Sequence, residues 1–407
     1  MAEDAPIVDA LAKLLQRSHL LVPADLAAEF TDAVRPLGIS EVRFYLVDLQ
    51  QQRLRPMAGA SGRTPPALRI VSTPAGEAYQ TTSVRSTLAE GERRLWIPLL
   101  DGTERLGVME VVSPGDDADV DQAELERCRM LASLAALIIT SKYVSSDIYA
   151  RLRRRREMAI QAEMAWAFMP PRTLATRRVI LAASLEPAYD VGGDAFDHSL
   201  FRDHLYFSLF DSVGHDLTAG LISSVAMASS RAARRAGGTL SDSVAQADRA
   251  IAGQFGESRF ATALLCDLDM DTGELSWIPC GHPPPLLIRD NMVIKQLVRE
   301  PWLPLGLGDT GEPMSPTVYT EELQPGDRVL LFTDGVLEAR AQSGRELGVT
   351  GLSDFIIRHS AEGLAAPETL RRLNQAILDH QHGRLRDDAT VVLVEWMPAD
   401  PEERLTL

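Results

Sequence analysis

Residues 205–216 read Leu-Tyr-Phe-Ser-Leu-Phe-Asp-Ser-Val-Gly-His-Asp, and this stretch decides the fold of the second half of the chain. Its first six residues are almost entirely apolar, which is typical of a buried strand. Asp211 follows at once, and a helix is expected to begin just after Asp216. A buried strand that ends on an acid holds a carboxylate at the edge of a sheet. The stretch therefore predicts a polar site at the end of a strand.

Three further stretches place acids next to strands. A glycine pair precedes Asp194 and frees the backbone to present the carboxylate. Residues 328–333 form a second apolar strand that leads into Asp334 and a glycine, and Asp387 and Asp388 stand directly before a third. Carboxylate oxygens suit hard divalent cations, and a pair of such ions can hold a bridging water. The four stretches together predict a site for divalent cations.

Each of these motifs also has an ordinary structural explanation. An Asp-Gly pair after a strand is a turn in most proteins, and Gly-Gly-Asp can be a plain loop. Asp-Asp before a strand commonly faces solvent. Their occurrence together, each beside a strand, is what favours a metal site.

The composition argues against several other classes of protein. The 407 residues include 41 Lys and Arg against 57 Asp and Glu, and the net charge of −16 opposes non-specific binding to DNA or anionic membrane. None of the three lysines follows a glycine, so a Walker A loop is absent. The three cysteines show neither C-x-x-C spacing nor the loop of a cysteine-dependent phosphatase. We expect no nucleic-acid partner and no thiol chemistry.

The expected location is the cytoplasm. No apolar run approaches 18 residues, and the chain starts on acidic residues where a signal peptide would be basic. Sparse cysteines fit a reducing compartment. We therefore expect a protein that does not bind a membrane.

The first segment, residues 1–147, is typical of a small α/β domain. Two short amphipathic helices are followed by four strand-like stretches, and a long helix starts near Asp121. Within residues 95–111, Asp101-Gly102 separates two apolar runs, which is a strong hairpin signal. This order resembles a GAF domain, a small-molecule sensory fold, although the N-K-x-D-E motif of its cyclic-nucleotide type is absent. The resemblance implies a sensor for an unknown small molecule or protein.

The second segment, residues 148–171, is expected to be a linker helix. Its arginine run from Arg151 is expected to form a solvated helix face. An apolar stripe follows, and Pro170-Pro171 ends the helix. A helix that continued from Asp121 through this segment would be long enough to pair with a copy of itself. This predicts a homodimer formed through the linker helix.

The third segment, residues 172–398, has strands and helices in mixed order. Expected strands are 179–185, 205–210, 260–267, 274–279, 328–332 and 390–395, and expected helices are 217–236, 240–255, 349–359 and 367–380. This part of the sequence resembles the PPM serine/threonine phosphatases, specifically the bacterial SpoIIE/RsbU-type subfamily. The lines that carry the resemblance cover almost all of residues 180–395: EPAYDVGGDAFD (186–197), LFDSVGHD (209–216), SRFATALLCDLDMDTGELSWIPCGHPPPLLI (258–288), PLGL (304–307), LQPGDRVLLFTDGVLEAR (323–340) and RDDATVVLV (386–394).

The resemblance implies an α+β protein whose C-terminal domain is an α-β-β-α sandwich with two divalent cations, Mn²⁺ or Mg²⁺. Asp194 and Asp211 are the expected catalytic residues, with Asp211 bridging the metals. A metal-activated water would attack phosphorus in line, so that no protein nucleophile is needed. The expected metal site consists of Asp194, Asp211, Ser212 through its backbone carbonyl, Asp334, Asp387 and Asp388.

One position departs from the subfamily pattern, because Asp216 stands where a glycine is usual. Asp216 could favour the helix dipole in a first helical turn, or it could lie near the metals and change their affinity. His215 and His282 match the family lines, and we expect them to organise loops. Trp166 and Trp302 are expected to be packing residues.

By resemblance, the substrate is a phosphorylated anti-anti-sigma (STAS) protein in a partner-switching pathway. Two alternatives stay open. Residues 192–196 echo the G-G-D-E-F motif of diguanylate cyclases, but Ala195 stands where the cyclase needs an acid. A catalytically weak phosphatase-like module that sequesters a partner would keep the same fold without turnover.

Overall fold

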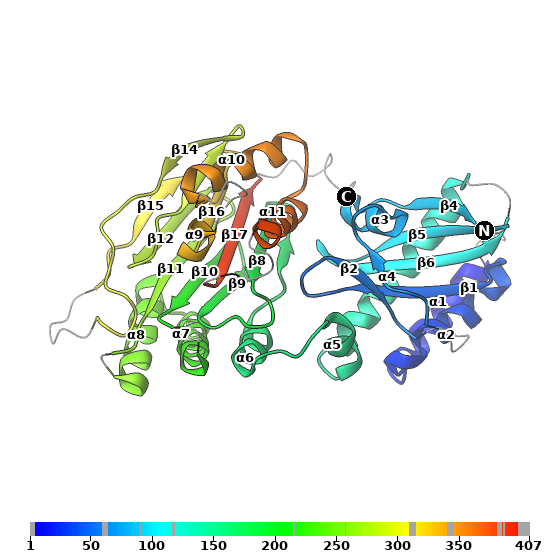
Figure 1. Ribbon diagram of the computed structural model, residues 1–407, viewed down its shortest axis with the longest axis horizontal. Helices are drawn as coiled ribbons and strands as arrows, with labels where there is room; N and C mark the ends of the chain where they lie inside the picture. The colour runs from blue at the N-terminus through cyan, green and yellow to red at the C-terminus, as the bar shows by residue number, and fades with distance from the viewer. Residues whose placement is uncertain are drawn as a thin grey trace. The chain divides into compact units, whose positions relative to one another are not determined.

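The computed structural model describes residues 5–58, 64–89, 91–115, 119–214, 216–256, 258–308, 315–339, 346–380, 385 and 387–397. The chain divides into two compact units, Met1–Glu157 and Met158–Thr406. Figure 1 shows the elements of both units, and each unit is described here by itself.

The N-terminal unit is built on one antiparallel sheet of six strands in the order β3-β2-β1-β6-β5-β4. Its strands and helices are α1 (Ala5–Arg17), α2 (Leu26–Val34), β1 (Glu41–Val47), β2 (Arg53–Pro56), β3 (Leu68–Arg69), α3 (Pro74–Thr81), β4 (Arg85–Ala89), β5 (Glu92–Asp101), β6 (Glu104–Pro114), α4 (Gln122–Tyr143) and α5 (Asp147–Arg153). The expected hairpin is β5–β6, where Asp101 pairs with Glu104 and Gly102 has a positive φ of 59°.

Alternate residues of these strands fill two apolar cores, one on each face of the sheet. The larger core joins α1, α2 and α4 to residues such as Phe44 and Met109, and the smaller one joins α3 to Tyr45 and Val108. Thr73 caps α3 by accepting the N–H of Gly76, and Asp121 caps α4 by accepting the N–H of Glu124.

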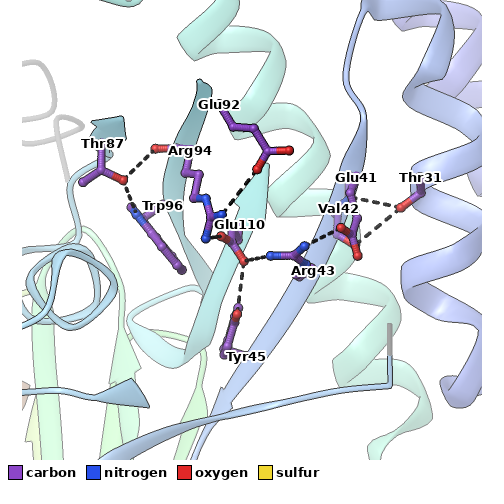
Figure 2. A network of polar contacts seen from close by, with 10 residues as sticks. All are labelled: Thr31, Glu41, Val42, Arg43, Tyr45, Thr87, Glu92, Arg94, Trp96 and Glu110. Atoms are coloured by element: carbon purple, nitrogen blue, oxygen red, sulfur yellow. Dashed lines mark hydrogen bonds and ion pairs between the residues drawn. The ribbon is translucent and has the colours of Figure 1, made fainter. Parts of the chain in front are cut away.

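A polar network lies on the same sheet face as the smaller core (Figure 2). Glu110 on β6 is fully buried, and its Oε2 accepts hydrogen bonds from Tyr45 (3.1 Å) and Arg43 (3.3 Å). Arg94 Nη1 lies 3.6 Å from Oε1 of Glu110. Burial and the Glu110 carboxylate together raise the pKa of Tyr45. The two arginines compensate a charge that would otherwise be costly to bury.

The expected continuous helix from Asp121 through residues 148–171 is wrong. Helix α4 ends at Tyr143, the axis turns by 106° into α5, and the next helix begins only at Ile160. The break has a local cause, because the Ser146 hydroxyl accepts the N–H of Ile148 and starts a new helix. The homodimer stays a prediction, and it can no longer rest on one long helix.

The arginine run is also not a solvated helix face. Only its first part belongs to α5, and Arg153 donates to the Tyr143 hydroxyl at 2.9 Å. The carbonyl of Arg154 accepts from Arg55 at 2.6 Å, and Arg155 lies 3.7 Å from the buried Asp48. The run is therefore tied to the hairpin β1–β2 of its own unit.

Across the described residues, no single helix is long and apolar enough to cross a membrane, whereas α4 and α5 pass that test of length and composition only as a bent pair.

The C-terminal unit contains two antiparallel sheets, one of five strands (β15-β12-β11-β10-β9) and one of six (β14-β13-β16-β17-β8-β7). Its strands and helices are α6 (Ile160–Phe168), β7 (Thr173–Ala175), β8 (Val179–Glu186), β9 (Asp194–Phe201), β10 (His204–Ser212), α7 (Leu217–Arg235), α8 (Leu240–Phe255), β11 (Ala261–Asp269), β12 (Glu274–Cys280), β13 (Leu286–Arg289), β14 (Met292–Gln296), β15 (Tyr319–Glu322), β16 (Arg328–Phe332), α9 (Asp334–Glu338), α10 (Gly348–Ala361), α11 (Ala366–His380) and β17 (Ala389–Trp396).

The two sheets face each other, and helices cover their outer faces. Helices α7 and α8 lie on the five-stranded sheet, and α10 and α11 lie on the six-stranded sheet (Figure 1). Strand β17 shows why this unit needs four layers, because Val392 and Val394 enter the core between the sheets while Val391 and Leu393 pack under the outer helices. A strand that is apolar on both faces must be covered on both. The expected α-β-β-α sandwich is confirmed.

Six long strands (β8, β10, β11, β12, β16 and β17) and four helices (α7, α8, α10 and α11) were predicted to within a few residues. Strands β7, β9, β13, β14 and β15 and the short helix α9 were not predicted, and Asp194 is the first residue of β9. These elements lack a long apolar run, so their pairing with neighbouring strands decides them.

We expect Gly107→Ala to destabilise the N-terminal unit by about 3 kcal/mol or more. A Cβ at this position would lie 1.9 Å from the backbone carbonyl oxygen of Tyr45, where β6 pairs with β1. Gly102→Ala is the matched control, since its Cβ would meet no atom within 4 Å and only the positive φ opposes it, at about 1 kcal/mol. Thermal and urea unfolding measure both, and equal losses would contradict the steric explanation.

Candidate metal centre

The first two predicted acids lie opposite each other on neighbouring strands. Asp194 on β9 pairs directly with Asp211 on β10 in the antiparallel register. Asp194 is only 3% exposed and Asp211 is half-buried. Two carboxylates are thus held side by side at one edge of the five-stranded sheet.

Two threonines of the other sheet hold the Asp194 carboxylate. Thr333, directly after β16, donates its hydroxyl to Asp194 Oδ2 at 2.9 Å, and Thr390 on β17 donates to the same oxygen at 2.5 Å. The two threonines also bond each other, because the N–H of each donates to the other residue. Asp194 therefore connects the two sheets. Neither threonine was singled out from the sequence, although each lies within two residues of a predicted acid.

Asp388 fixes the loop that leads into β9. Its Oδ2 accepts the backbone N–H groups of Gly192 (2.7 Å), Gly193 (2.7 Å) and Asp194 (3.2 Å). A Cβ at Gly193 would lie 2.4 Å from the carbonyl oxygen of Ser212, so only glycine allows this close approach. Asp388 and the glycine pair at 192–193 thus together fix the backbone that leads to Asp194.

The remaining acids complete the cluster from the six-stranded sheet. Asp334 opens α9 directly after β16, and Asp387 precedes β17; both side chains are exposed. Gly335 allows the start of α9 to approach the segment before β17, since a Cβ at this position would lie 2.0 Å from the carbonyl oxygen of Asp388. The fold therefore brings the five predicted aspartates to one end of the sandwich.

Negative charge in this cluster is poorly compensated. Burial, together with Asp334, Asp387 and Asp388, raises the pKa of Asp211 to about 7. Burial and the neighbouring Asp211 and Asp388 raise the pKa of Asp194 well above its usual value, against the opposing effect of the two threonine hydroxyls. Partial desolvation by the surrounding atoms and the neighbouring Asp387 raise the pKa of Asp334. Carboxylates that repel each other in this way favour a bound cation.

The donor set fits hard divalent cations, because it offers several carboxylate oxygens and repelling charges that a cation would neutralise. The aspartate side chains do not yet converge on a common centre. Within the described part of the chain, no group of three His, Cys, Asp or Glu residues is arranged to hold a metal ion. Ser212 donates its hydroxyl to the carbonyl of Ala219 at 2.7 Å, and the role of its own carbonyl as a metal ligand stays a prediction.

Of the two roles that the sequence left open for Asp216, the structure shows the one at the start of a helix. It is the N-cap of α7, and its carboxylate accepts the N–H of Ala219 at 3.0 Å. This bond, helped by Arg259, lowers the pKa of Asp216. His215 lies outside the described residues.

His282 organises the core beside the cluster. Its Nε2–H donates to the carbonyl of Phe332 at 3.1 Å, so its Nδ1 accepts the hydroxyl of Thr262 at 2.8 Å. Thr262 stands opposite Asp211 in the register, and Phe332 precedes Thr333. The neutral ring thus links the two sheets next to the acids, as expected for a structural histidine. Trp166 and Trp302 pack against the core as predicted.

The comparisons with known proteins agree with this architecture. Residues 202–397 match the family model "Stage II sporulation protein E (SpoIIE)". The phosphoserine phosphatase RsbU of Bacillus subtilis is 22% identical over 242 residues, which are 59% of this chain and 70% of RsbU. Protein IcfG of Synechocystis sp. is 27% identical over 146 residues, which are 35% of this chain and 22% of IcfG.

Among solved structures, the RsbU and RsbW domains of a Mycobacterium tuberculosis protein are 26% identical, with a TM-score of 0.47, over 55% of this chain and 63% of that one. The two-sheet sandwich with its acidic cluster defines the C-terminal unit as a PPM-type phosphatase domain. Residues 202–397 of this unit match the SpoIIE family model, and the chain is homologous to RsbU. The cyclase alternative is excluded for this unit, and Ala195 is buried in the core.

We expect Asp388→Ala and Asp387→Asn to change stability in opposite directions when metal has been removed with a chelator. Asp388→Ala leaves three backbone N–H groups without their acceptor and should cost about 3 kcal/mol. Asp387→Asn removes repulsion from Asp211 and Asp334 and should raise the unfolding midpoint slightly. Thermal unfolding with and without Mn²⁺ measures this, and a loss of stability in both metal-free variants would contradict the division of roles.

Stability should also depend on pH through His282. Burial lowers its pKa from 6.5 to about 4 in the folded protein. Below pH 6.5 the unfolded chain binds a proton at this residue that the folded chain does not, so the contribution of His282 to stability falls as pH falls from 6.5 to 4 and then levels off. The raised pKa of Asp211 acts in the opposite direction over this range, so the His282 effect is the difference between wild type and variant. At pH 5 the loss relative to pH 7 is about 2 kcal/mol. Urea unfolding of wild type and His282→Gln across this range isolates the effect, which should vanish in the variant.

Proposed function

We propose that this protein is a metal-dependent phosphatase that removes phosphate from phosphoserine or phosphothreonine in a signalling protein. The observation that carries the proposal is the cluster of five aspartates at one end of the sandwich. Four of them, Asp211, Asp334, Asp387 and Asp388, lie in the segment that matches the SpoIIE family model. The homologue RsbU is named as a phosphoserine phosphatase.

In this proposal Asp194, Asp211, Asp334 and Asp387 would hold two divalent cations, Mn²⁺ or Mg²⁺, and the Ser212 carbonyl would be a further ligand. Bound cations would lower the pKa of a water molecule and offset charge on the phosphoryl oxygens. Asp388 accepts three N–H groups at its Oδ2, so it positions the Asp194 loop, and its place in the metal site stays a prediction.

The residues of the chain itself have distinct tasks. Thr333 and Thr390 orient Asp194 through its Oδ2, which leaves Oδ1 of that carboxylate free of these bonds. Asp211 is held on the adjacent strand, where like charges keep its proton affinity high until a cation enters. A rigid set of oxygens that repel each other is pre-organised for cations, because little rearrangement is needed on binding.

The substrate in this proposal is a phosphorylated anti-anti-sigma protein of the STAS type. Support comes from the relation of this chain to RsbU. The match spans 70% of RsbU and 22% of IcfG. Partners that bind the remaining parts of those proteins are therefore not proposed for this chain.

The N-terminal unit is proposed as a GAF-like sensor that controls the phosphatase. Its sheet face carries Glu110, whose Oε1 is buried and accepts no hydrogen bond from any described residue. An unsatisfied buried acceptor between two arginines is a reasonable contact for a signal molecule. Helix α6 follows this unit along the chain and contacts the metal-site loop, because Ala159 donates to the Tyr189 carbonyl (2.9 Å) and Trp166 to the Ala188 carbonyl (2.7 Å).

Asp211→Asn should abolish Mn²⁺-dependent release of phosphate from a phosphorylated STAS protein, with at least a 100-fold loss of kcat/KM. It should unfold no earlier than wild type without metal, because it removes repulsion. Asp290→Asn is the control, since Asp290 is exposed in the β13–β14 turn at a φ of 48°, which Asn tolerates. Wild-type protein that binds the phosphoprotein but never releases phosphate would instead support the sequestering module.

A further inference from the structure

Arg259 lies beside the loop that continues from Asp211, and none of the roles described above uses it as a functional group. It precedes β11, and the N–H of Val213 donates to the carbonyl of the next residue, Phe260, at 3.2 Å. A Cβ at Gly214 would lie 3.6 Å from Nη1 of Arg259, so the guanidinium rests over this loop. Three residues further on, Thr262 stands opposite Asp211.

The guanidinium of Arg259 has donors to spare. Its nearest acid is Asp216, whose Oδ2 lies 3.9 Å from Nη2, well beyond the 2.7–2.9 Å of a charge-assisted hydrogen bond. Within the part of the chain that the structure describes, the guanidinium donates no hydrogen bond. The side chain is 37% exposed, so a ligand can reach it. Asp216 itself is engaged elsewhere, as the cap of α7.

The charges around this loop explain what such a cation can do. The acids described above make the rim negative, and a phosphomonoester dianion that approaches it is repelled wherever metal does not offset the charge. Arginine binds phosphate through two parallel N–H groups, which fixes orientation as well as charge. Arg259 lies beside the loop that carries Asp211 onward to α7.

We propose that Arg259 is a positioning residue that binds the phosphoryl group of the substrate, and that Asp216 holds the guanidinium over the loop until phosphate replaces it. This deepens the proposed function and rests on it. The acid that stands where the subfamily usually has glycine then has a second task besides capping α7. It keeps the guanidinium over the loop without satisfying its donors.

The test compares Arg259→Ala and Arg259→Lys with wild type, using p-nitrophenyl phosphate for turnover and inorganic phosphate as a competitive ligand at saturating Mn²⁺. For Arg259→Ala we expect KM and the inhibition constant of phosphate to rise by about 10- to 100-fold, with kcat changed by less than about 3-fold. Arg259→Lys should recover part of the affinity, because it keeps the charge and loses the fork. Mn²⁺ affinity, from titration calorimetry, should stay unchanged.

Two controls separate this role from a structural one. Arg235→Ala removes an exposed arginine from the last turn of α7 and should leave KM and the inhibition constant unchanged. Asp216→Asn keeps the helix cap, frees the guanidinium and should lower the inhibition constant of phosphate. A lowered melting temperature in Arg259→Ala with wild-type phosphate affinity would overturn the proposal.

Failure of the proposed function gives a different result. If wild type shows no turnover, equilibrium binding of inorganic phosphate to the Mn²⁺-loaded protein still tests Arg259. Binding that weakens by the same factor in Arg259→Ala supports the positioning role, although the phosphatase activity would be disproved. Binding that is absent in wild type, or equal in the two proteins, overturns the inference about Arg259.

Discussion

The hydrogen bonds that Asp388 accepts from three successive backbone N–H groups are the interaction on which the rest of the C-terminal unit depends. They anchor the loop at Gly192 and Gly193 to the start of β17, and so they set where β9 begins. Asp194 then reaches Thr333 and Thr390 in the opposite sheet. The two sheets are thus tied at one end by polar bonds in addition to the apolar core between them.

The same bonds explain why the protein tolerates so much negative charge in one place. Each buried carboxylate is stabilised by donors from the backbone or from threonine, which offsets part of the cost of burial. The compensation is incomplete, as the raised pKa of Asp211 shows. A cluster that is held rigidly and remains under-compensated gains free energy when a cation binds, and this links the stability of the fold to its chemistry.

The apolar strands and the acids beside them could be predicted because both are local features. Residues 205–210 are apolar except for Ser208, and Asp211 follows, so strand and carboxylate were predicted together. Thr333, Thr390 and His282 could not be given their roles in the same way, since each role depends on a contact between the two sheets. The linker was predicted wrongly because the apolar stripe was given more weight than Ser146, whose capping bond starts a separate helix.

The sequence by itself determined the long apolar strands, the glycine pair before Asp194 and the identity of the acidic residues, because these follow from periodicity, side-chain size and charge. The tertiary structure alone decided how each acid is surrounded. Asp387 and Asp388 are adjacent and chemically identical, yet Asp387 is exposed, whereas Asp388 is buried and accepts three backbone N–H groups at its Oδ2. That difference arises from a loop almost 200 residues away, and only folding brings the two segments together.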